Sequence, residues 1–194
     1  MSAPPSGRGS GFSVAIAAPN SLPRERIGGA GADLAAILNA VAAGRYPPPD
    51  GTVTILSQPS PRDAGVIALT GSSVIFADTD PDWIATQLPP GDLSAPLAAP
   101  FLAALSERLR RRSHSVDMIT CAGALPGPLP PDLPLTELAI GGGRASHPRV
   151  ARALRYRDDV RAWQTTGGVL LVGHGVAGRW EVAIEVDPEC RSHG

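Results

Sequence analysis

Hydrophobic positions recur with helical spacing in several parts of the chain. Between residues 33 and 43, Leu34, Ile37, Leu38 and Val41 fall on one side of a helix that Gly44 would end. The same spacing predicts a helix over 100–111, and a basic stretch over 149–156 is compatible with another. A further helix is predicted over 81–88, because Asp80 suits the N-cap and Pro81 the first helical position.

Short apolar and β-branched runs between these helices predict strands. In the first two thirds of the chain they cover residues 52–57, 65–70, 73–77 and 116–122, with Gly71-Ser72 as a hairpin turn. After residue 147 three more runs follow at 159–165, 168–173 and 180–187, separated by short turns that contain glycine. Three strands joined in this way predict an antiparallel meander.

The last strand alternates strictly between apolar and polar residues. Trp180, Val182, Ile184 and Val186 share one face, and the residues between them, which include Glu181 and Glu185, share the other. We therefore expect one apolar face suited to burial and one polar face that could border a cleft.

Together these elements predict an α/β (α+β) fold with a mixed, mostly antiparallel sheet and flanking helices. Residues 1–29 are rich in Ser, Gly and Pro and are expected to be disordered or loosely ordered. Residues 30–125 would form an N-terminal α/β half, and residues 126–146 a Pro- and Gly-rich linker. Residues 147–194 would form the C-terminal half.

Composition narrows the functional classes. The formal charge of −1 over 194 residues gives no overall attraction to nucleic acid. The apolar run at residues 12–18 could imitate a signal peptide, but it is much shorter than the roughly 20 residues that span a bilayer. Two cysteines form no disulfide framework and the histidines are scattered, so we expect a cytoplasmic protein without a metal site and without a membrane partner.

The end of the chain carries the most specific pattern. The strand at 180–187 runs into Val-Asp-Pro, and Arg191-Ser-His-Gly194 follows. This resembles the start of the acetyl-coenzyme A motif of the GNAT N-acetyltransferase superfamily, an Arg or Gln followed by x-x-Gly-x-Gly or Ala. The phrases at 59–65, 92–97 and 124–128 resemble the N-terminal half of actinobacterial members, so the likeness covers roughly residues 30–194.

The resemblance implies transfer of an acetyl group from acetyl-coenzyme A to an amine on a small molecule or a peptide. A glycine-rich turn at the end of the strand would bind the pyrophosphate through backbone N–H groups. The implied cofactor-binding residues are Val186, Asp187, Arg191, Ser192, His193 and Gly194. Glu181 is the implied general base, acting directly or through water.

The chain departs from the family pattern because Gly194 is the first motif glycine and the last residue. We therefore expect a partial GNAT-like fold, an inactive or incomplete enzyme, and weak or absent binding of acetyl-coenzyme A. The apolar row on the last strand would stay uncovered beside an unpaired sheet edge, which favours self-association. The alternative is a non-catalytic binding or regulatory module on a GNAT-like scaffold.

Other residues have simpler interpretations. Arg108 and the three arginines at 110–112 cluster at a helix end, where cations complement the helix dipole, although nucleic-acid binding is the alternative. His174 lies in a Gly-His-Gly turn and is expected to be an exposed turn residue, with a role as ligand or base as the alternative.

Overall fold

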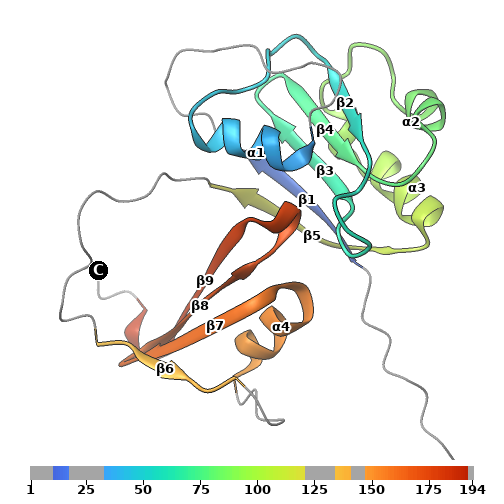
Figure 1. Cartoon of the computed structure of the whole chain (residues 1–194). Helices are drawn as coiled ribbons and strands as arrows, with labels where there is room; N and C mark the ends of the chain where they lie inside the picture. The colour runs from blue at the N-terminus through green and yellow to red at the C-terminus, as the bar shows by residue number, and fades with distance from the viewer. Residues whose placement is uncertain (1–10, 18–32, 121–133, 141–146, 192–194) are drawn as a thin grey trace, which may run out of the picture. The chain divides into compact units, whose positions relative to one another are not determined.

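The computed structural model describes residues 11–17, 33–120, 134–140 and 147–191 (Figure 1). The chain divides into two compact units, one spanning Ser10–Ala124 and one that takes in the C-terminal segment from Leu125. The fold is α+β, with one mixed sheet and one antiparallel sheet flanked by helices, as predicted.

The N-terminal unit is built on a five-stranded sheet with the order β2-β4-β3-β1-β5. Its strands are β1 (Gly11–Ala17), β2 (Val53–Leu56), β3 (Gly65–Leu69), β4 (Ser72–Phe76) and β5 (Arg112–Ile119). β3 and β4 form an antiparallel hairpin, whereas the pairs β1–β3, β1–β5 and β2–β4 are parallel. This sheet is therefore more parallel than the sequence suggested.

β1 corrects the expectation that residues 1–29 lack regular structure. Gly11–Ala17 forms a strand between β3 and β5, parallel to both. Seven apolar or small residues in a row are typical of a strand in a parallel sheet, but the same run also fits the apolar part of a signal peptide. The structure pairs this run with strands far away in the sequence, which local periodicity cannot show.

Helices cover both faces of this sheet in Figure 1, with α1 on the side opposite α2 and α3. Their bounds are α1 (Leu34–Ala42), α2 (Pro81–Gln87) and α3 (Ala99–Leu109), and a short 3-10 turn, η1 (Ala95–Leu97), precedes α3. β4 is buried along its whole length because it has helices on both sides. Among the described residues, no helix has the length and apolar character needed to cross a membrane.

The caps explain where two of these helices begin. Asp33 accepts a hydrogen bond from the backbone N–H of Ala36 at 2.7 Å, and Asp80 accepts one from Asp82 at 3.0 Å. Each carboxylate satisfies an N–H group that the first helical turn leaves without a partner. Pro81 then occupies the first helical position, as predicted.

The β3–β4 hairpin turns at Thr70-Gly71, one residue earlier than the predicted Gly71-Ser72. Gly71 has a φ of +76°, which side chains larger than hydrogen rarely adopt. A Cβ at this position would also lie 2.7 Å from the Cβ of Pro49. Both the turn conformation and the close approach of the neighbouring loop require glycine here.

The C-terminal unit contains a four-stranded antiparallel sheet with the order β6-β7-β8-β9. Its elements are β6 (Thr136–Leu138), α4 (Pro148–Tyr156), β7 (Asp158–Thr165), β8 (Gly168–His174) and β9 (Trp180–Val186). A 3-10 turn, η2 (Val176–Gly178), joins β8 to β9, and another, η3 (Pro188–Cys190), follows β9. The predicted meander is confirmed, but the stretch expected to be a linker also contributes the short strand β6.

α4 covers one face of this sheet. Val150 and Ala153 of the helix pack against Ala162, Val169 and Leu171 of β7 and β8, and all five are buried. On the opposite face the apolar row of β9 is exposed, with exposed fractions of 60% for Trp180, 59% for Val182 and 61% for Ile184. The row that the sequence marks as suited to burial is therefore the uncovered one, and the polar row faces the helix side.

Replacing Leu105 by alanine tests the core of the N-terminal unit. Leu105 is fully buried in the cluster formed by α2, α3, β3 and β4, so Leu105→Ala should lower the free energy of unfolding by about 2–5 kcal/mol in urea denaturation. Leu93, which is 56% exposed in the same unit, is the matched control, and Leu93→Ala should change it by less than about 1 kcal/mol. Equal losses for the two variants would contradict this packing.

Candidate functional site

The backbone of β9 has one edge bonded to β8 and one edge directed away from it. The N–H of Gly175 donates to the carbonyl of Arg179 and the N–H of Asp187 donates to the carbonyl of Gly167, both at 2.9 Å. These bonds extend the β8–β9 ladder, so the odd-numbered residues of β9 direct their N–H and C=O groups toward β8. The even-numbered residues, from Trp180 to Val186, direct theirs to the outer edge.

A short turn leads the chain away from this edge. The N–H of Cys190 donates to the carbonyl of Asp187 at 2.9 Å, which closes η3, and Arg191 Nε donates to the carbonyl of Val186 at 2.8 Å. The guanidinium of Arg191 therefore lies against the end of the outer edge. Of the six residues assigned to cofactor binding, Val186, Asp187 and Arg191 lie together here, and 192–194 fall outside the described residues.

Glu181 lies on the face of β9 that α4 covers, and both of its carboxylate oxygens have partners. Oε2 accepts a hydrogen bond from Arg157 Nε at 2.9 Å, and Oε1 accepts one from the backbone N–H of Val176 at 3.0 Å. A Cβ at Gly175 would displace this carboxylate from its present position. Glu181 thus links the end of α4, the η2 turn and β9, and it can reach an amine only through its remaining lone pairs or through water.

The second glutamate of β9 has a weaker attachment. Arg149 lies near the start of α4, and its Nε is 3.9 Å from Oε2 of Glu185. Its Nη2 donates to the carbonyl of Ile184 at 3.4 Å. Arg149 and Glu185 are both about 40% exposed, so water screens their attraction. The two ends of α4 are therefore tied to β9 by ion pairs of unequal burial.

His174 makes more contacts than an exposed turn residue would. Its Nδ1 lies 3.2 Å from Oδ2 of Asp159, and its ring lies 3.9 Å from the ring of Trp180, measured between centroids. Asp159 sits in an irregular part of the β7–β8 ladder with a φ of +48°, a conformation that is rare outside glycine. The sequence missed this cluster, because an irregular ladder has no local signal that separates it from a regular strand.

Two arginines of the basic cluster, Arg108 and Arg111, have partners within the N-terminal unit. Arg108 stacks over the ring of Trp83, with 5.3 Å from its Cζ to the centroid, and donates to Thr79. Arg111 donates to the carbonyls of Pro61 and Arg62. These contacts support the interpretation of the cluster as a structural one. No group of three or more potential metal ligands occurs among the described residues.

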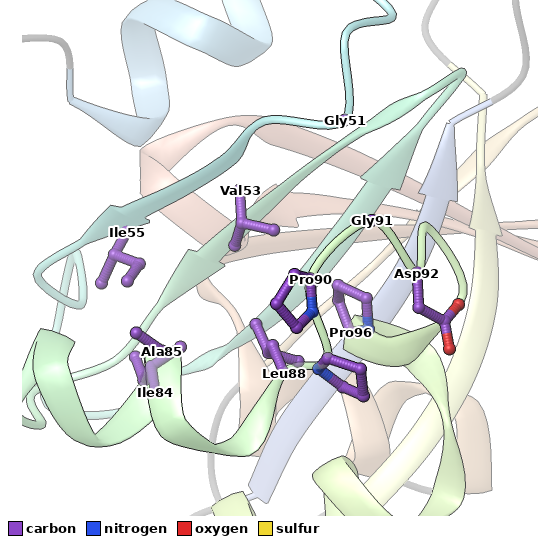
Figure 2. A pocket seen from close by; sticks show the side chains of 11 residues that line it. Gly51, Val53, Ile55, Ile84, Ala85, Leu88, Pro90, Gly91, Asp92 and Pro96 are labelled. Carbon is purple, nitrogen blue, oxygen red and sulfur yellow. The ribbon is translucent and has the colours of Figure 1, made fainter.

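The N-terminal unit has a pocket of about 270 Å³ between β2 and the segment that follows α2 (Figure 2). Figure 2 shows Val53 and Ile55 on β2 pointing toward α2. The lining is mostly apolar: Gly51, Val53, Ile55, Ile84, Ala85, Leu88, Pro89, Pro90, Gly91, Asp92 and Pro96. A pocket of this composition suits a small apolar group and offers one carboxylate for orientation.

Hydrogen bonds hold the pKa of Asp92 below the 3.8 that is usual for aspartate. The main cause is the hydroxyl of Ser94, which donates to Oδ1 at 2.6 Å, and the backbone N–H of Ser94 adds a second bond at 2.9 Å. Both bonds favour the ionised carboxylate. Asp92 is therefore negatively charged at neutral pH at the rim of the pocket.

A double-mutant cycle tests whether Arg157 and Glu181 stabilise the C-terminal unit. The exposed fractions of their side chains are 17% and 36%, so we expect Arg157→Ala and Glu181→Ala to show a coupling of about 1 kcal/mol in the free energy of unfolding. The control is the more exposed pair Arg161 and Glu137, for which the coupling should stay below about 0.5 kcal/mol. A smaller coupling for Arg157 and Glu181 than for the control pair would show that Glu181 has no special structural role.

Nuclear magnetic resonance titration of the Asp92 carboxyl tests its hydrogen bonds with Ser94. Because the pKa is lowered on folding, Asp92 stabilises the fold above its unfolded-state pKa, and this contribution disappears as the pH falls through the folded-state pKa. Ser94→Ala removes the stronger bond and should raise the pKa of Asp92 toward 3.8. An unchanged titration in the variant would show that the hydroxyl bond does not form.

Comparison with protein-family models, with curated proteins and with solved structures finds no significant match to this chain. Interpretation of its function therefore depends on the residues and geometry described above.

Proposed function

We propose that the C-terminal unit is the first part of a GNAT-type N-acetyltransferase site that uses acetyl-coenzyme A and an amine acceptor. In this proposal the outer edge of β9 receives the pantetheine arm, and the turn that begins at Asp187 leads into the pyrophosphate-binding segment of residues 191–194. The acceptor is a small molecule or a peptide, and the protein acts in the cytoplasm.

One observation supports this function best. The outward N–H and C=O groups of Val182, Ile184 and Val186 form a continuous edge that ends at the Asp187-Pro188 turn and Arg191. A pantetheine arm carries two amides, which can bond to such an edge as a strand does. The cationic side chain of Arg191 at the end of the edge suits a pyrophosphate.

The chemistry assigned to the site is an acyl transfer. A neutral amine attacks the thioester carbonyl, the carbon–sulfur bond breaks, and coenzyme A leaves as the thiolate. An outward N–H group of β9 can polarise the carbonyl as negative charge develops on its oxygen. Glu181 remains the proposed base, and the contacts of its carboxylate with Arg157 and Val176 favour a proton path through water.

A non-catalytic module is the second candidate. The observation that favours it is that Glu181 connects three parts of the scaffold, as a structural residue does. The apolar pocket of the N-terminal unit would then be the binding site. The two candidates differ in where a ligand binds: at the outer edge of β9 for the acetyltransferase, or in the apolar pocket for the module.

Titration of the ¹⁵N-labelled full chain with acetyl-pantetheine and with acetyl-coenzyme A tests the acetyltransferase proposal. The amide resonances of Val182, Ile184 and Val186 should shift, because their N–H groups point to the outer edge. The amides of Ala183 and Glu185 are the internal control and should shift less, because they are bonded to β8. Arg191→Ala should weaken binding of acetyl-coenzyme A and leave binding of acetyl-pantetheine unchanged.

Shifts confined to the pocket residues around Leu88 would instead support the second candidate. The absence of any shift on β9 at millimolar ligand would overturn the proposed pantetheine site.

A further inference from the structure

β9 is the end strand of its sheet in the part of the chain that the structure describes, and its outer edge has the form of a template for another strand. The β8–β9 ladder directs the N–H and C=O groups of Trp180, Val182 and Ile184 outward. An edge strand without bulge, proline or lysine tends to pair with another chain. Trp180–Val186 has none of these protective features.

The same residues carry exposed apolar side chains. Trp180, Val182 and Ile184 are each about 60% exposed, and they lie beside Val172 and Leu170 of β8 on the face opposite α4. A strand added at the edge would cover part of this row. The edge therefore gains both hydrogen bonds and apolar contact from a partner strand.

We propose that a second copy of this chain pairs with β9 in antiparallel orientation, with Val182 opposite Val182 of the partner subunit. In this register Arg179 lies opposite Glu185 of the partner subunit, and Trp180 lies opposite Ile184 of the partner subunit. A two-fold axis relates the copies, so each of these contacts occurs twice. Opposite charges and an aromatic residue facing a β-branched one are favourable cross-strand pairs.

The pattern of charges selects this register from the alternatives. An antiparallel ladder must pair even-numbered residues of β9 with even-numbered ones, because only these direct their backbone groups outward. Centring the ladder on residue 181 or 185 places a glutamate opposite itself. Centring it on residue 183 or 184 places Glu181 opposite Glu185 or Asp187. The register centred on Val182 places no two carboxylates opposite each other. It also pairs at least five residues of each strand that lie outside the η2 turn, and no other register meets both conditions.

The helix of the C-terminal unit leaves room for the partner strand. α4 packs on β7 and β8, and only its Arg149 side chain is seen to reach the outer edge of β9, where it bonds to the carbonyl of Ile184. In the order β8-β9-β9-β8 the two β8 strands, on which the two α4 helices pack, are three strand spacings apart, about 14 Å. Helices packed side by side have axes about 8–10 Å apart, so the two helices do not collide. The bond from Arg149 to the carbonyl of Ile184 also persists, because a carbonyl oxygen can accept a second hydrogen bond.

This inference does not depend on the proposed acetyltransferase function, and its test contains no coenzyme A. If both proposals hold, the dimer and the pantetheine arm occupy the same edge and exclude each other.

Charge exchange between the two opposed residues tests the proposed register. Sedimentation of the full chain from micromolar to millimolar concentration should show a monomer–dimer equilibrium. Arg179→Glu and Glu185→Arg each place like charges opposite one another twice, and each should raise the dimer dissociation constant about tenfold to a hundredfold. An equimolar mixture of the two variants restores both Arg–Glu contacts, so the heterodimer should form with an affinity near that of the unaltered chain.

The control is Arg155→Glu, which makes the same charge change on α4 and should leave dimerisation unchanged. Recovery in the mixture also shows that both variants are folded. In hydrogen exchange, the amides of Trp180, Val182 and Ile184 should become protected as the concentration rises. A monomer at all concentrations, unaltered dimerisation of the single variants, or failure of the mixture to recover would each overturn the proposal.

Discussion

The register of β8 against β9 is the constraint on which the functional interpretation of this chain depends. Bonds at both ends of the ladder, at Gly175 and at Asp187, determine which residues of β9 direct their backbone groups toward β8 and which direct them outward. The same register determines the side chains on each face, since neighbours along a strand point to opposite sides. A shift by one residue would place Glu181 and Glu185 on the exposed face and would turn the apolar row toward α4.

α4 reinforces this register through charge. Arg157 and Arg149, at the two ends of the helix, contact Glu181 and Glu185, so the polar row of β9 is held on the helix side. The Glu181 pair is the less exposed one and includes a bond to the turn between the strands, so it contributes more to order than the Glu185 pair. A residue in this position has a structural role whether or not it also transfers a proton.

Both proposals assign a binding partner to the outer edge of β9. Its backbone groups are suited to any extended partner, whether the partner is a pantetheine arm or another strand. The side chains distinguish the two: Arg191 at one end favours an anion, whereas Arg179 and Glu185 complement a second copy of the same strand. If both proposals hold, competition between ligand and partner links the association state of the chain to the supply of acetyl-coenzyme A.

The sequence alone determined most of the elements. Helical spacing located α1 and α3, alternation located β9, and glycine turns separated β7, β8 and β9, because each of these signals is local. It also identified the apolar row of β9 and both glutamates. Binding of acetyl-coenzyme A, the role of Glu181 as general base and cofactor binding by residues 192–194 stay predictions.

Only the tertiary structure decided the remaining features, because they join residues far apart in the chain. Periodicity could not show that Gly11–Ala17 lies between β3 and β5, since a short apolar run carries no information about its partners. It could not pair Arg157 with Glu181, or bring Asp159 to His174, because those contacts arise from strand register and an irregular ladder. It also could not choose the face that α4 covers: burial of Ala162, Val169 and Leu171 from neighbouring strands made that choice, and it left the most apolar row of β9 exposed.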